Sequence, residues 1–179
     1  MIEIKNPYRY FNLINRILNR HLIDSPKGLK GFIRIRRSPN GIEGWEIPID
    51  QENRRVSYHD QSFININSEK GIYSLQKDTY FIEDLHYHYE PNKNGCLKFR
   101  FDLDNPLEGI HANPDPKTGM PHRVMPDDIQ LDFKQMNLYL MLELVTYYIQ
   151  TKNYPLDNSF AKEYNEIVNR TRGEMENGG

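Results

Sequence analysis

The sequence predicts an α+β fold: an antiparallel sheet of about five to six strands packs on a central C-terminal helix, and a further helix stands at the N-terminus. Three observations predict it, namely apolar residues at helical spacing near the start, alternating patterns in the middle, and a long apolar helical stretch near the end. We expect residues 1–172 to form a single α+β domain and residues 173–179 to be a frayed C-terminal tail.

The N-terminal helix is expected over residues 7–22. Asn6 suits the N-cap and Pro7 the first helical position. Five apolar residues then recur with the period of one helix face: Tyr10, Leu13, Ile14, Ile17 and Leu18.

The middle of the chain alternates as strands do. We expect strands at residues 31–37, 45–49, 63–67 and 71–75, the first two separated by the turn Ser38 to Gly41 and the last two by a tight turn at Ser68 to Gly71.

The clearest hairpin joins residues 81–90 to residues 96–103 through Pro91 to Gly95. A three-residue loop would place His88 opposite Arg100 and His86 opposite Asp102, whereas a five-residue loop would shift the pairs by one step on the same face. The opposite faces of the two strands are aromatic and aliphatic and belong in the core: Leu85, Tyr87, Tyr89, Leu97, Phe99 and Phe101.

Residues 104–127 contain five prolines and are expected to be irregular. We expect the central helix to follow Asp127 and Asp128 and to end near residue 151, because Asn153 to Pro155 breaks the pattern. A last, polar helix should end near Arg172.

Composition excludes several classes of protein. The 179 residues carry a formal net charge of −2, so any anion site must be a local patch. One cysteine excludes an internal disulfide framework and a multi-cysteine zinc site. Because the sequence shows neither a long apolar run nor an apolar signal region, we expect a cytoplasmic protein that makes no use of a membrane.

The polar face of the hairpin carries the side chains best suited to acid–base chemistry or metal binding. Two imidazoles share it with carboxylates and cations, and histidines suit proton transfer near neutral pH. The simplest interpretation is a solvated sheet face held by cross-strand pairs. Two functional hypotheses compete with it.

The first hypothesis is cleavage of RNA without a metal or other cofactor. His86 and His88 would be the base and the acid, Asp102 would orient a histidine, and Arg100 would neutralise the phosphate. The proline-rich segment would fold over the face and add His122 as a catalytic residue. Further substrate-binding candidates are Arg123, Lys98, Arg34 and Arg36, although the last two also fit an ordinary charged sheet face.

The second hypothesis is a divalent transition metal. A His-x-His pair on a strand projects both rings to one side, as metal ligation requires. His86 and His88 would be two ligands, and His122, His111 or Asp102 would be the third.

Residues 87–123 resemble the TumE-type toxin components of bacterial toxin–antitoxin modules. The matching motifs are Tyr87-His88-Tyr89, Asn94-Gly95, Phe99-Arg100-Phe101-Asp102, Asn105-Pro106, His111 and Pro121-His122-Arg123. The resemblance covers about a fifth of the chain. It implies a toxin-like nuclease or translation-targeting activity that a partner protein, the cognate antitoxin, neutralises.

A non-catalytic interaction module or accessory subunit of a defence or toxin–antitoxin complex is the alternative. In that case the apolar helix and the tyrosine-rich faces would serve assembly, and a homo-oligomer would also fit.

Overall fold

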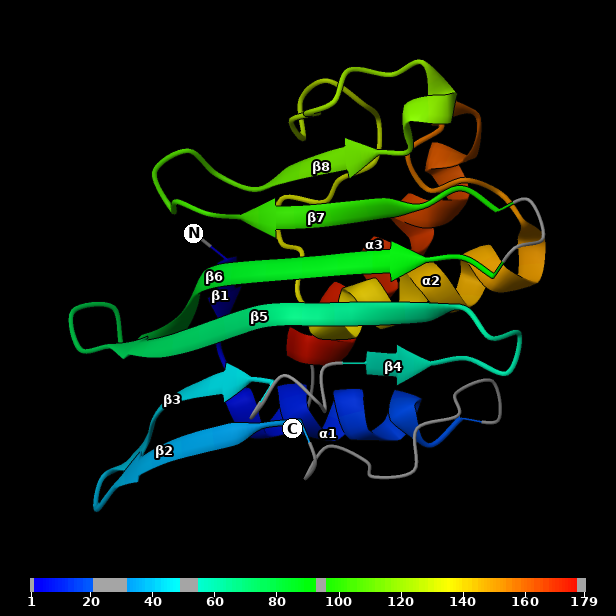
Figure 1. Cartoon of the computed structure of the whole chain (residues 1–179). Coiled ribbons are helices and arrows are strands. Elements are labelled where there is room, and N and C mark those ends of the chain that lie inside the picture. The colour runs from blue at the N-terminus through cyan, green and yellow to red at the C-terminus, as the bar shows by residue number, and fades with distance from the viewer. Residues whose placement is uncertain (1, 21–31, 49–54, 93–95, 177–179) are drawn as a thin grey trace.

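The computed structural model describes residues 2–20, 32–48, 55–92 and 96–176. Within them, eight strands form one antiparallel sheet and three α-helices accompany it, so the predicted α+β class is confirmed (Figure 1). The elements are β1 (Ile2–Ile4), α1 (Pro7–Leu18), β2 (Arg34–Ser38), β3 (Gly41–Ile47), β4 (Arg55–Ser57), β5 (Phe63–Ser74), β6 (Thr79–Glu90), β7 (Phe99–Leu103), β8 (His111–Pro114), α2 (Leu138–Thr151) and α3 (Ala161–Glu176), with short 3-10 turns at Pro116–Thr118 and Asn158–Phe160.

The sheet is organised around its two long strands, β5 and β6. The strand order is β2-β3-β5-β6-β7-β8, with β4 pairing the start of β5 and β1 pairing the start of β6. Helices α2 and α3 lie behind this sheet in Figure 1, and no helix of the described residues lies in front of it. The sheet therefore has one face packed on helices and one face without them.

Helix α1 begins as its sequence predicts. The side chain of Asn6 accepts a hydrogen bond from the Arg9 N–H, and Pro7 occupies the first turn. The helix ends at Leu18, whereas the prediction extended it to residue 22, and residues 21 and 22 lie outside the described residues.

Helix α2 is the centre of the core, as predicted. It is apolar on nearly all sides, because it contacts β6 on one side and α1 and α3 on others. The predicted inward faces of the hairpin pack against this layer, with Tyr89 and Phe99 around the ring of Tyr148. The helix begins at Leu138 rather than near residue 128, since turns occupy the preceding residues and Asn137 supplies the N-cap.

The predicted turn at Ser68 to Gly71 is wrong. These residues lie inside β5, which runs without interruption from Phe63 to Ser74 and has two irregularities in its pairing with β6. Gly71 serves a close approach instead of a turn, because a Cβ there would lie 2.2 Å from ring atoms of Trp45. Two predicted strands are therefore one.

The proline-rich segment extends the sheet. Part of it forms β8, which pairs with β7, and Val124 then pairs with Ala112 along the far side of β8. The chain thus adds width at the edge of the sheet (Figure 1), where the sequence predicted irregular structure.

The C-terminal helix is longer than expected. Helix α3 continues to Glu176, so residues 173–176 are helical instead of forming the predicted frayed tail. Residues 177–179 lie outside the described residues.

Candidate functional site

Strand alternation gathers polar groups on the helix-free side of the sheet, which we call the open face. On β6 it carries Asp84, His86, His88 and Glu90, each partly exposed, while the residues between them are buried. The register pairs His86 with Asp102 and His88 with Arg100. These are the pairs predicted for a three-residue hairpin loop, although residues 93–95 lie outside the described residues.

Asp102 is the hub of this face. The residue is 5% exposed, and its carboxylate has Oδ1 2.9 Å from His86 Nδ1 and Oδ2 2.8 Å from Arg100 Nε. The Asn113 side-chain amide donates to Oδ2 at 2.6 Å, and His111 Nε2 lies 3.8 Å from the same oxygen. A buried carboxylate with this many partners fixes the positions of the side chains around it.

His86 is held as an imidazolium. Besides Asp102, its ring contacts Asp84 and Asp104, whose carboxylate oxygens each lie 3.4 Å from Nε2. Hydrogen bonds with Asp102 and Asp84 raise the pKa of His86 to about 10. The same contact lowers the pKa of Asp84. His86 therefore carries a proton throughout the neutral range.

The pKa of His88 is shifted in the opposite direction. Burial lowers its pKa, and the charges of Arg100 and Lys98 add to that effect against the opposing charge of Glu90. Its Nε2 lies 3.0 Å from Glu90 Oε1, and 28% of the side chain is exposed. A neutral imidazole that donates from Nε2 keeps Nδ1 as a proton acceptor.

His111 joins the cluster from β8. It stands opposite Asp102 in the sheet, is 5% exposed, and has its pKa lowered by burial and by Arg123. The sequence had placed it in an irregular segment beside the cluster. Asn113 was not predicted at all, because a four-residue strand reading His-Ala-Asn-Pro has no strand signal.

The predicted site residues of the later proline-rich segment are exposed. His122 is exposed and lies two residues before Val124. In the described part of the chain the charged partners of His86 are three carboxylates, so His122 is not one of them. Arg123 pairs with Glu108 at 3.3 Å. The proline-rich segment therefore contributes β8 and the carboxylate of Asp104 to the open face, and its later part runs along the far side of β8.

Three predicted substrate-binding cations differ in their distance from the histidines. Lys98 is exposed just before β7, close enough to affect the pKa of His88. Arg34 and Arg36 lie on β2, the edge strand three positions away from β6 in the strand order. Arg34 still shares the open face, in a row of paired residues that continues through Glu46 and Lys70 to Asp84.

Two further polar clusters lie on the helix side of the sheet. Glu69 is 1% exposed and accepts hydrogen bonds from the Tyr10 hydroxyl (2.6 Å), the Trp45 indole (2.6 Å), the Leu138 N–H (3.2 Å) and the Tyr87 hydroxyl. Burial nevertheless raises the pKa of Glu69. The prediction from the sequence did not include Glu69, because it assigned Ser68 to Gly71 to a turn.

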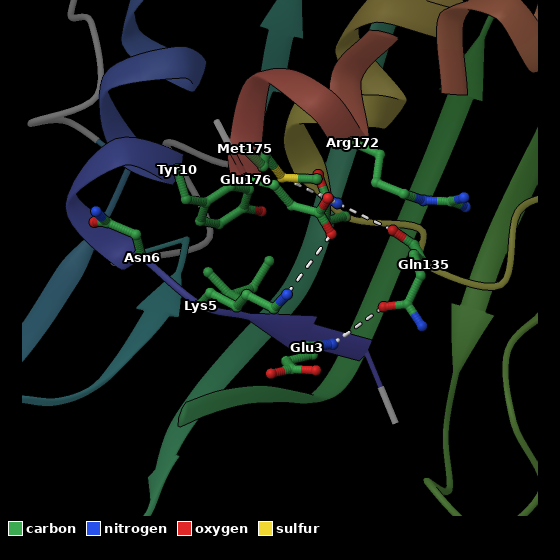
Figure 2. Close-up of a pocket in the computed structure, with 10 residues that line it drawn as sticks. Glu3, Lys5, Asn6, Tyr10, Gln135, Arg172, Met175 and Glu176 are labelled. Carbon is green, nitrogen blue, oxygen red and sulfur yellow. Dashed lines mark hydrogen bonds and ion pairs between the residues drawn. The ribbon is translucent and has the colours of Figure 1, made fainter. Parts of the chain in front are cut away.

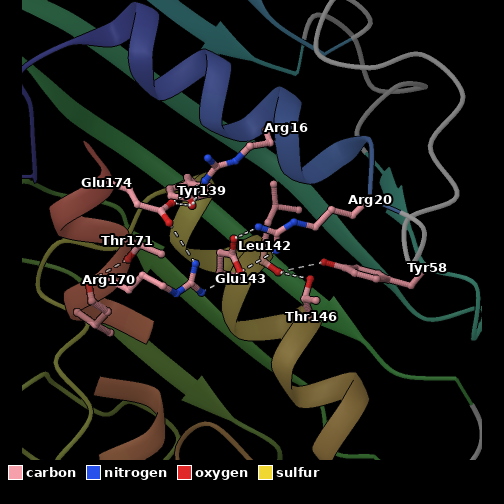
Figure 3. Close-up of polar contacts among 11 residues, drawn as sticks. Arg16, Arg20, Tyr58, Tyr139, Leu142, Glu143, Thr146, Arg170, Thr171 and Glu174 are labelled. Carbon is pink, nitrogen blue, oxygen red and sulfur yellow. Dashed lines mark hydrogen bonds and ion pairs between the residues drawn. The ribbon is translucent and has the colours of Figure 1, made fainter. Parts of the chain in front are cut away.

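The second cluster ties the three helices together (Figure 3). Glu143 of α2 pairs with Arg20 at 2.8 Å and Arg170 at 3.1 Å, and Glu174 of α3 pairs with Arg16 at 2.7 Å. Each arginine of this cluster is engaged by a carboxylate, which gives the cluster a structural role.

One cavity of about 170 Å³ lies away from the open face (Figure 2). Its wall includes Glu3, Lys5, Gln135, Arg172 and Glu176. Lys5 and Glu176 pair across it at 3.9 Å, and Gln135 accepts from the Glu3 N–H at 3.1 Å. The cavity therefore does not involve the histidine cluster.

Comparisons with known proteins add no further identification: no family model, curated protein or solved structure matches this chain. Among the described residues, no group of three or more His, Cys, Asp or Glu side chains has the arrangement of metal ligands. No described helix is long and apolar enough to cross a membrane.

Proposed function

We propose that the open face is the active site of a metal-independent endoribonuclease. One observation carries the proposal: His86 and His88 project from one strand to the same side, and their surroundings shift their pKa values in opposite directions. A protonated and a neutral imidazole side by side are the acid and the base that phosphodiester cleavage requires.

The neutral His88 would accept the proton of the ribose 2′-hydroxyl. The 2′-oxygen then forms a bond to phosphorus, the bond from phosphorus to the 5′-oxygen breaks, and His86 gives a proton to the departing oxygen. The products are a 2′,3′-cyclic phosphate and a free 5′-hydroxyl. The His86 Nε2 suits this transfer, since its contacts at 3.4 Å are longer than the 2.9 Å contact of Nδ1.

Arg100 would stabilise the charge that develops on the phosphate oxygens. Asp102 anchors its Nε, while 43% of the arginine side chain is exposed. Asp102 thereby positions both the acid and the phosphate-binding cation. Lys98 adds a second positive charge beside His88.

The raised pKa of His86 favours this chemistry over the metal-bound alternative. A histidine ligand must be neutral, so a metal would have to displace the proton that Asp102 and Asp84 stabilise. Of the three candidates for the third ligand, His122 is exposed, while His111 and Asp102 lie in the cluster.

A toxin-like role under the control of a partner protein is part of the proposal. It is supported by the motif resemblance in residues 87–123 and by an active face that a protein partner can reach directly. We expect expression of the chain alone to arrest bacterial growth, and co-expression of the cognate antitoxin to restore it.

Incubation of the purified protein with total RNA tests the activity. Cleavage should persist in excess chelator and should fall at least about a hundredfold in His88→Ala, in line with the usual contribution of a general base. His59→Ala is the matched control, because His59 is an exposed histidine in the turn after β4. Loss of cleavage on chelation would favour a metal site.

The pH profile supplies a second, independent readout. The rate should rise with the deprotonation of His88 below its ordinary pKa, remain level through neutrality, and fall as His86 loses its proton near pH 10. A sharp optimum near pH 6 would contradict the assignment of His86 as the acid.

A non-catalytic interaction module is the second candidate, favoured by the arrangement of charges on the open face. Cations and carboxylates alternate there in register, as in the row Arg34, Glu46, Lys70 and Asp84. A flat patterned surface of this kind can bind a protein of complementary charge. Absence of RNA cleavage under every condition, together with a stable complex isolated from the host, would support this function.

A further inference from the structure

An aromatic side chain interrupts the polar surface of the open face beside His88. Phe63 lies at the start of β5, paired with Glu90, and it is partly exposed. Its neighbours Ile64 and Ile66 are fully buried on the helix side, so alternation places Phe63 and Asn65 on the open face.

Arg55 of β4 covers this ring. Its guanidinium carbon lies 4.1 Å from the ring centroid of Phe63, and its Nε donates to Asn65 Oδ1 at 3.2 Å. The two contacts hold the guanidinium over the ring. Arg55 is itself exposed, so the guanidinium presents its outer side to solvent.

The strand register aligns Arg55 and Asn65 with the proposed catalytic groups. Arg55 pairs with Asn65, Asn65 with His88, and His88 with Arg100, in a single row across four strands. Neighbouring strands are about 4.8 Å apart, so the backbone of Arg55 lies about 10 Å from that of His88. Side chains of this length can contact the base and the ribose of one nucleotide.

We propose that Arg55, supported by Phe63 and Asn65, is a stacking site for a nucleobase of single-stranded RNA. This inference rests on the proposed function, because it assumes that the open face binds RNA. The base stacks on the outer side of the guanidinium, the attached ribose lies at His88, and the following phosphate lies at Arg100. A base-paired strand could not place a base flat against the sheet, so the site selects unpaired RNA.

Arginine suits this role better than lysine. A guanidinium is planar and stacks on rings, whereas an ammonium group is a strongly hydrated point charge. The contact with Phe63 also fixes the side chain before binding, which lowers the entropy lost when a base arrives.

Binding measurements with the inactive His88→Ala protein test the proposal. The probes are a fluorescent oligoadenylate of about eight nucleotides and an abasic sugar–phosphate chain of the same length. Arg55→Ala should weaken binding of the oligoadenylate about tenfold and binding of the abasic chain less than about threefold, since only the first loses stacking. Arg55→Lys, which retains the charge, should behave like Arg55→Ala on the oligoadenylate.

Lys77→Ala is the matched control. Lys77 also places a cation over an aromatic ring, 4.9 Å from the centroid of Phe81, but in the turn between β5 and β6. This variant should bind both probes as the parent does. Equal losses on both probes in Arg55→Ala, or full binding in Arg55→Lys, would overturn the stacking site while leaving the nuclease proposal intact. If the His88→Ala protein with Arg55 intact binds neither probe, both the stacking site and the nuclease proposal are overturned.

Discussion

His86 links the charge of the open face to the stability of the fold. Its pKa in the folded protein, about 10, lies above the ordinary value of 6.5, so folding favours the protonated form. The resulting stabilisation is fully present below about pH 6.5 and is lost as the pH rises toward 10. At neutral pH most of it remains.

Replacement of His86 by glutamine should expose this dependence. We expect the difference in unfolding free energy between the parent and His86→Gln to be largest near pH 6.5 and to shrink steadily up to pH 10. Urea denaturation at a series of pH values measures it, with His59→Gln as the exposed control. A difference that stays constant across this range would show that His86 is not protonated in the folded protein.

Glu69 should be the carboxylate whose loss costs the most stability. Glu69→Ala removes the acceptor of four buried donors and leaves their desolvation uncompensated. We expect a loss of about 3 kcal/mol in unfolding free energy, measured by chemical denaturation. Glu83→Ala, at a partly exposed position of β6, should cost less than about 1 kcal/mol.

Prediction of individual residues succeeded where a local rule governs their position. The period of a strand is sufficient to bring His86, His88, Arg100 and Asp102 to one face, and the length of one loop determines which of them pair. The contributions of His111 and Asn113 depend on β8, whose sequence resembles a loop and becomes a strand only by pairing with β7. Glu69 was missed for the converse reason, because a turn-like sequence lies inside a strand.

At the scale of elements, the packing of β5 against β3 depends on a glycine, Gly71. A methyl group at Gly71 would overlap the ring of Trp45, which is itself fully buried. Gly71→Ala should therefore lower the unfolding free energy by about 3 kcal/mol, as overpacked cores do. The exposed Asn67→Ala in the same strand should change it by less than about 0.5 kcal/mol, and thermal denaturation compares the two.

The N-cap of α1 offers a milder test of an element. Asn6→Ala removes the acceptor for the Arg9 N–H and should cost about 1 kcal/mol. Asn12→Ala, at an exposed position inside the same helix, should be neutral or slightly stabilising, because alanine has the higher helix propensity. A loss in Asn12→Ala equal to that in Asn6→Ala would contradict a capping role.

Elements were predicted well where their signals are local. The cap of α1, the apolar helix α2 and the β6–β7 hairpin follow from spacing and turn residues. Strands β1, β4 and β8 have three or four residues each, and they exist because a longer strand offers its edge to them. No periodicity can be read from so few residues.

At the scale of the whole molecule, the end of α3 joins the first helix to the last. Glu174 pairs with Arg16 and Arg170 and accepts from the Tyr139 hydroxyl, which connects all three helices (Figure 3). A chain that ends at Arg172 should therefore be about 1 to 3 kcal/mol less stable than one that ends at Glu176. Equal unfolding midpoints for the two chains would show that the last turn of α3 contributes nothing.

The pairing of distant parts of the chain has a consequence during synthesis. Arg16 and Glu174 are 158 residues apart, and β1 pairs with β6 across most of the first half of the chain. A ribosome takes on the order of ten seconds to make a stretch of that length. For most of that interval the apolar face of α1, with Tyr10, Ile14 and Ile17, lacks α2, its main helical partner. The nascent chain therefore presents part of an apolar helix face near its start until α2 emerges.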